Sequence, residues 1–162
     1  MKNRNHYPKL NLPPCRLRVA ERGGELCVWD GVRGRWLVLT PEEWVRRHVL
    51  AMLVSGAGIE AAAIAQEYPV AVGGATQRAD IVVFGLGGRP LMVVECKAPG
   101  VAVSDAVLAQ AFRYNAVLGA RYVMLTNGVD HYIYEVTPGC GSGSEPGSGG
   151  EYTPLKEFPD LK

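Results

Sequence analysis

The sequence lacks several features that would assign it quickly to a class of protein. No apolar run approaches the length of a membrane span, and the polar first residues lead into no apolar segment, so we expect neither a span nor a secretory signal. The cysteines, Cys15, Cys27, Cys96 and Cys140, follow no zinc-binding spacing, and without a secretion signal nothing favours disulfides. We therefore expect a reduced, cytoplasmic setting.

Excess charge is also lacking, because the net charge is only +1. Its distribution is nevertheless uneven: residues 1–47 contain ten Lys and Arg against five Asp and Glu, and the remainder contains seven against eleven. A basic N-terminal part beside an acidic remainder is compatible with a phosphate-backbone ligand. An ordinary solvated surface explains the same charges, and charge alone favours that simpler interpretation.

The length of 162 residues, with 48% hydrophobic and 20% charged residues, is typical of one globular domain with a real core. We divide the chain into an N-terminal arm over residues 1–15, a main domain over 16–136, a Gly/Ser-rich flexible loop over 137–150 and a tail over 151–162. Leucine and phenylalanine in the tail could dock it back on the main domain.

Apolar periodicity and turn residues predict a mixed α/β order of elements in the main domain. Trp29 and Trp36 are interpreted as packing residues rather than a base-stacking platform, and the last strand is expected at a sheet edge. In chain order the predicted elements are a β-ribbon over 15–40, a helix over 41–55, a short helix over 59–65, strands over 67–72, 78–84 and 91–97, a helix over 104–118, and strands over 121–126 and 131–136.

The first long helix begins with two acids. Thr40 is the predicted N-cap, a proline occupies the first helical position, and a capping box would pair Thr40 with Glu43. The spacing from Val45 and Val49 places Glu42 on the buried side of the helix and Glu43 nearer its edge. An inward acid could reach a metal site, whereas stabilisation of the helix dipole explains either acid equally well.

Charged residues of one predicted hairpin form the strongest candidate site. Asp80 begins its first strand, and Glu95 and Lys97 end its second strand on one face, with Cys96 on the other. Pairing of the two strands would bring both carboxylates beside the ammonium. Two carboxylates are suitable ligands for Mg²⁺ or Mn²⁺, and a lysine can stabilise phosphoryl charge or orient a water. Ordinary charged strand ends are the alternative.

The motifs in this order resemble the PD-(D/E)xK nuclease superfamily, and more narrowly the N-terminal nuclease-type domain of type I restriction enzyme R subunits. The resemblance covers about residues 16–136 and the tail. Its matching segments are Thr40-Pro41-Glu42-Glu43-Trp44-Val45-Arg46, Asp80, Val93-Val94-Glu95-Cys96-Lys97-Ala98-Pro99, Gln110-Ala111-Phe112-Arg113-Tyr114-Asn115 and Leu125-Thr126-Asn127-Gly128.

The resemblance implies a restriction-endonuclease-like fold, in which helices flank a central mixed β-sheet. It implies that Asp80 and Glu95 bind Mg²⁺ or Mn²⁺ with help from the backbone carbonyl of Cys96, and that Lys97 serves the attacking water. The acid on the first helix would complete the metal shell, and we assign this role to Glu42, with Glu43 as the alternative.

Gln110 and Tyr114 match a helix motif of family members that act with motors, and we include both among the candidate catalytic residues. The resemblance implies hydrolysis of DNA phosphodiester bonds without a covalent intermediate, by an endonuclease in preference to an exonuclease.

The sequence contains no Walker A pattern, so we expect this chain to act without a motor of its own, alone or with helicase or restriction-modification subunits in trans. The alternative is a non-catalytic nucleic-acid-binding or assembly module that retains the fold. A hydrolase of another phosphate ester is a third interpretation.

Overall fold

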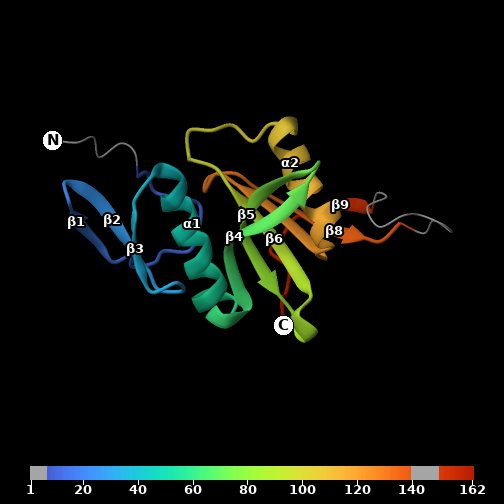
Figure 1. Cartoon of the computed structure of the whole chain (residues 1–162), viewed down its shortest axis with the longest axis horizontal. Coiled ribbons are helices and arrows are strands. Elements are labelled where there is room, and N and C mark those ends of the chain that lie inside the picture. The colour runs from blue at the N-terminus through green and yellow to red at the C-terminus, as the bar shows by residue number, and fades with distance from the viewer. Residues whose placement is uncertain (1–6, 140–149) are drawn as a thin grey trace.

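A computed structural model describes residues 7–139 and 150–162, and its main feature is a six-stranded sheet with the strand order β4-β5-β6-β7-β8-β9 (Figure 1). Neighbouring strands are antiparallel except β6 and β7, which are parallel and are connected through helix α2 (Asp105–Leu118). The strands are β4 (Ile64–Val72), β5 (Ala75–Phe84), β6 (Pro90–Cys96), β7 (Tyr122–Thr126), β8 (His131–Thr137) and β9 (Glu151–Leu155).

A small antiparallel sheet precedes the main one, as the sequence predicts. It consists of β1 (Val19–Arg22), β2 (Glu25–Asp30) and β3 (Arg35–Val38). Helix α1 (Pro41–Ala51) continues into a π-helical turn over Met52–Gly56 and lies between this ribbon and the main sheet (Figure 1). The predicted N-cap is confirmed, because the Thr40 hydroxyl accepts a hydrogen bond from the Glu43 amide at 3.1 Å.

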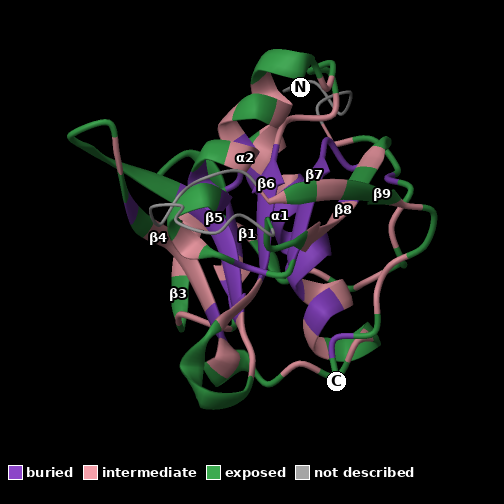
Figure 2. Cartoon of the chain, turned by 90° about the vertical axis from the view of Figure 1, so that its right-hand side faces the viewer, coloured by how far each residue is buried: buried purple, intermediate pink, exposed green. Residues whose placement is uncertain are grey.

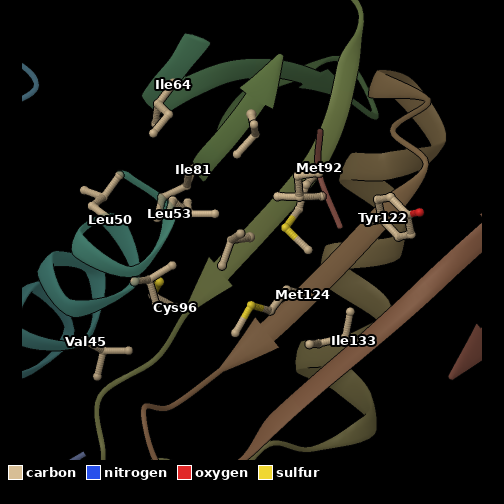
Figure 3. Packing of buried hydrophobic residues seen from close by; sticks show 14 of the residues in the cluster. Val45, Leu50, Leu53, Ile64, Ile81, Met92, Cys96, Tyr122, Met124 and Ile133 are labelled. Carbon is tan, nitrogen blue, oxygen red and sulfur yellow. The ribbon is translucent and has the colours of Figure 1, made fainter. Parts of the chain in front are cut away.

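The main sheet buries apolar side chains on both faces, so the fold has the predicted layout of a mixed sheet flanked by helices. One core packs α1 and the π-helical turn against alternate residues of the central strands, and Figure 3 shows Val45 and Leu53 facing Ile81 and Met124. The second core lies under α2, where Tyr114 packs with neighbouring valines. Buried residues are concentrated on β5, β6 and β7 (Figure 2).

Helix α2 begins and ends where the sequence predicts. The Ser104 hydroxyl accepts a hydrogen bond from the Val107 amide at the N-terminus, and Gly119, with φ of 67°, forms the left-handed C-cap.

Two predicted elements are wrong. Residues 59–65 do not form a second helix: only Ala61–Ala63 make a 3-10 turn, and β4 begins at Ile64, which pairs with Val83 of β5. The strand over 131–136 is not an edge strand either, because β8 lies between β7 and β9. Both errors have the same cause, because hydrogen bonding to a segment distant in the sequence determines the outcome. Pairing with β5 makes residues from Ile64 onward a strand, and pairing with β9 places β8 inside the sheet.

The ends of the chain contribute to the main core. Leu10 from the arm and Leu161 from the tail are both buried in the α1-side core, and the tail supplies β9. Residues 140–149 of the predicted flexible loop, with Cys140, lie outside the described residues, whereas the other three cysteines are free. No helix in the described ranges is long and apolar enough to cross a membrane.

Candidate functional site

The candidate site lies where β5 and β6 stop pairing. The last regular pair on this side is Ile81 with Val94, and Asp80 and Glu95 lie one step beyond it. The Asp80 amide donates a hydrogen bond to Glu95 Oε1 at 3.1 Å, and the Cys96 amide donates one to Asp80 Oδ2 at 2.7 Å. Each carboxylate therefore binds the backbone of the opposite strand, which brings the two acids together as the sequence predicts.

Both carboxylates are buried, with Asp80 9% and Glu95 3% exposed. Burial and the neighbouring charge of Asp80 raise the pKa of Glu95 well above its usual range, although the Asp80 amide and the positive charge of Lys97 oppose this shift. Two adjacent buried carboxylates are not both ionised without compensation: one of them keeps a proton, or a cation binds beside them.

Lys97 directly follows Cys96, the last residue of β6, and is half-buried. Its amide donates to the Thr126 carbonyl at 2.8 Å, which anchors the end of β6 to β7. Burial and the charge of Asp80 raise the pKa values of Glu95 and Glu42, and the positive charge of Lys97 opposes both shifts. The structure brings the two acids together, whereas the convergence of the lysine side chain with them stays a prediction.

Arg46 of α1 also enters this site, a role that its local sequence pattern does not reveal. Its guanidinium donates to Asp80 Oδ1 at 2.6 Å, to Glu43 Oε2 at 2.7 Å and to Glu42 Oε1 at 3.1 Å. The charges of Asp80, Glu43 and Glu42 raise the pKa of Arg46 against the opposing effect of burial. In this structure Arg46 is the cation that neutralises Asp80.

The predicted orientation of the two helix acids is wrong. The side chain of Glu43 is 8% exposed and that of Glu42 is 42% exposed, so Glu43 is the inward acid. The cause is that α1 is covered by the ribbon as well as by the main sheet, and Glu43 is held inward by Arg46 and Arg47. Burial and the charge of Asp80 raise the pKa of Glu42, so Glu42 still lies near the carboxylate pair. Which acid completes a metal shell stays a prediction.

A chain of buried ion pairs runs from this site to the ribbon. Glu43 Oε1 lies 2.7 Å from Arg47 Nε, and Arg47 Nη1 lies 2.8 Å from Asp30 Oδ1. Asp30 is fully buried at the end of β2 and also accepts from Arg33 and Gln66. We define Asp30, Arg47, Glu43, Arg46 and Asp80 as the ion-pair chain. Its sequence signal is the Glu-x-x-Arg-Arg spacing of α1, which places acid and base one turn apart.

Gln110 and Tyr114 bind each other, as their spacing on α2 predicts. Gln110 Nε2 donates to the Tyr114 hydroxyl at 2.8 Å, and that hydroxyl donates to Gln77 Oε1 on β5 at 2.9 Å. No hydrogen bond within the described residues joins this pair to Asp80 or Glu95. The structure thus attaches α2 to the strand that carries Asp80 without placing the pair among the carboxylates.

The donor groups fit a hard divalent cation. Mg²⁺ commonly uses only one or two protein carboxylates and keeps several waters, and Asp80 and Glu95 supply such a pair of oxygen donors. Arg46 balances the buried charge of Asp80 here, and a divalent cation carries the charge needed to take over this role. In the described part of the chain no group of three His, Cys, Asp or Glu side chains converges as a metal site.

The fold and the carboxylate pair together define a nuclease-like α+β domain. Residues 41–159 match the family model for the N terminus of the type I restriction enzyme R protein, and the chain belongs to this family. The match begins at α1, so the ribbon β1–β3 precedes it. No curated protein and no solved structure matches the chain.

Proposed function

We propose that this protein is a metal-dependent nuclease that hydrolyses phosphodiester bonds in DNA, as an endonuclease rather than an exonuclease. The observation that carries the proposal is the buried pair of Asp80 and Glu95 where β5 and β6 stop pairing, with Lys97 directly after the end of β6. Membership in a family of restriction-enzyme domains supports a nuclease-related role and DNA as the substrate.

In this proposal Asp80, Glu95 and the Cys96 carbonyl hold Mg²⁺ or Mn²⁺, and Glu42 completes the set. A bound divalent ion would lower the pKa of a water ligand and stabilise negative charge on the phosphate. Lys97 donates hydrogen bonds to the attacking water or to a phosphate oxygen, which orients the nucleophile and offsets developing charge. The backbone bonds of the two carboxylates hold them in place before substrate arrives.

Arg46 has a defined part in this scheme, because its guanidinium already binds Asp80 Oδ1. A cation that binds Asp80 through Oδ1 has to share that oxygen with Arg46 or displace it. Arg46 would then keep Glu43 as a partner, so displacement does not leave it unpaired.

The same contact supports a second function. If Arg46 permanently satisfies Asp80, the domain is a non-catalytic nucleic-acid-binding or assembly module that retains the nuclease fold. In either case the family supports an association with restriction-modification subunits, and the proposal includes a helicase motor that acts with this chain in trans.

Metal titration separates the two functions. Isothermal calorimetry with Mn²⁺ should show binding to the wild type and none to Asp80→Ala, and the same substitution should abolish Mn²⁺-dependent DNA cleavage. Asp105→Ala is the matched control, because Asp105 is an exposed acid at the start of α2. Absence of Mn²⁺ binding to the wild type would favour the non-catalytic module, and cleavage by Asp80→Ala would refute the assignment of the site.

A further inference from the structure

A hollow of about 420 Å³ opens between the ribbon and the β4–β5 hairpin. The ribbon contributes Arg33 and Arg35, which precede the segment that matches the family model, and the hairpin contributes the remaining side chains. We call it the arginine hollow. Its lining residues are Arg33, Arg35, Gln66, Glu67, Pro69 and Arg78.

The arginine hollow adjoins the carboxylate site along β5. Arg78 lies two residues before Asp80, and Glu67 lies opposite Asp80, between the ladder pairs Gln66–Ile81 and Tyr68–Ala79. The charges of Arg46 and Arg78 both lower the pKa of Glu67, after the larger effect of its hydrogen bond with Arg33. The arginine hollow and Asp80 are therefore neighbours on the β4–β5 hairpin.

Two guanidinium groups share one carboxylate in this hollow. Glu67 Oε2 lies 2.6 Å from Arg33 Nη1 and 3.9 Å from Arg35 Nη2. Arg33 is also bound to buried Asp30, so it is fixed in position, whereas the Arg35 side chain is 57% exposed and Arg78 is exposed. The hollow thus has an excess of positive charge, with two arginines free to turn toward a ligand.

Glu67 holds this position at a conformational cost. It is the one non-glycine residue with a positive φ in the described ranges, at 50°. L-residues adopt this left-handed region only under constraint, and such residues occur often at binding sites. With this backbone conformation the Glu67 carboxylate pairs with Arg33 and lies 3.9 Å from Arg35.

We propose that the arginine hollow binds a phosphodiester group of the nucleic-acid strand that lies across Asp80 and Glu95, and that the Glu67 carboxylate occupies the phosphate position in the free protein. This inference rests on the proposed function only for its choice of nucleic acid as the ligand. Guanidinium groups bind phosphate oxygens through paired, charge-assisted hydrogen bonds, as they bind carboxylates. The contact positions the backbone and reads no base sequence.

Binding of a labelled DNA duplex, measured by fluorescence anisotropy in EDTA over a range of salt concentrations, tests the inference without metal or cleavage. The double variant Arg35→Ala/Arg78→Ala should bind more weakly, and the slope of log K against log salt should fall in magnitude by about 1, because the hollow neutralises one phosphate. Glu67→Gln should bind the duplex more tightly, because the internal anion is removed while the side chain keeps its size.

Arg121→Ala is the matched control, because Arg121 is an exposed arginine bound to Glu135 on β8, away from the hollow. The inference is overturned if the double variant keeps the affinity and salt slope of this control, or if Glu67→Gln does not tighten binding. It is also overturned if these substitutions change only the affinity for inorganic phosphate and leave duplex binding unchanged.

The outcome is separable from that of the proposed function. If no condition gives cleavage but the affinity for the duplex depends on Arg35 and Arg78, the nuclease proposal is refuted and the proposed phosphate-binding role of the arginine hollow is supported. If cleavage is metal-dependent but the affinity for the duplex does not change when both arginines are replaced, only the proposed phosphate-binding role of the arginine hollow is refuted.

Discussion

Replacement of Asp30 by asparagine tests the ion-pair chain at its ribbon end. Asp30 is fully buried and accepts from Arg33 at 2.5 Å, from Arg47 at 2.8 Å and from Gln66 at 3.1 Å. Burial by itself would raise the pKa of Asp30, but the hydrogen bond from Arg33 and the charge of Arg47 outweigh it and lower the pKa from 3.8 to about 2. The folded protein therefore favours the ionised form more strongly than the unfolded chain does.

The lowered pKa has a defined consequence for stability. Because each pKa unit is worth 1.36 kcal/mol, ionised Asp30 stabilises the folded state by about 2 kcal/mol at neutral pH. This contribution is fully present above the unfolded pKa of 3.8 and is lost as the pH falls toward 2. Asp30→Asn removes the charge at every pH and leaves Arg47 buried beside a neutral group, which should cost about 3 kcal/mol at pH 7.

Urea unfolding followed by tryptophan fluorescence measures this difference in free energy of unfolding between wild type and Asp30→Asn. We expect the difference to be largest at neutral pH and to shrink by about 2 kcal/mol as the pH falls through 3.8 toward 2. Asp105→Asn, which changes an exposed acid, is the control and should show no such narrowing. A difference that stays constant over this pH range would refute the account of the ion-pair chain.

Three further substitutions test other contacts. Burial and the charge of Asp80 raise the pKa of Glu95 in the folded protein, so the wild type loses folding stability as the pH rises above 4.5. Glu95→Gln lacks this ionisation and should be more stable than wild type in EDTA, by a margin that grows with pH. Addition of Mn²⁺ should not raise the melting temperature of Glu95→Gln. Equal melting temperatures at all pH values would contradict this. Gly128→Ala should cost about 1–3 kcal/mol in urea unfolding, because φ is +84° and the new Cβ would lie 2.7 Å from Leu10 Cδ2. Gly119→Ala is its control, because φ is +67° there and no atom lies within 4 Å of the new Cβ, and it should lower the free energy of unfolding by less. Equal losses in the two variants would show that Leu10 moves away from the new Cβ without an energetic cost. Tyr114→Phe should lose about 1 kcal/mol of stability, because its hydroxyl binds both Gln77 and Gln110, and unchanged stability would show that these bonds contribute nothing.

Local sequence signals predict the elements that carry the site. The hairpin of β5 and β6 follows from two apolar runs around a Gly/Pro turn, and the α1 cap follows from Thr40 and the proline after it. Since side chains alternate along a strand, the same pattern also places Glu95 and Lys97 together.

Contacts between distant segments are beyond what local patterns predict. The inward position of Glu43 depends on the ribbon that packs against α1, and the role of Arg46 depends on its meeting Asp80, which is 34 residues away in the chain. Ile64 begins a strand because it pairs with Val83, although the alanines around it favour a helix. In each case tertiary packing overrides the local preference.

The central claim is that Asp80, Glu95 and Lys97 form a metal-dependent DNA-cleaving site, and a cleavage assay tests it most directly. Wild type and Lys97→Ala would be incubated with linear, circular and single-stranded DNA in Mg²⁺, in Mn²⁺ and in EDTA, with Lys156→Ala as a control that removes an exposed lysine of the tail. We predict cleavage by the wild type and the control only when the metal is present, and its loss in Lys97→Ala. Cleavage that persists in Lys97→Ala, or no cleavage by the wild type on any DNA form, would contradict the claim.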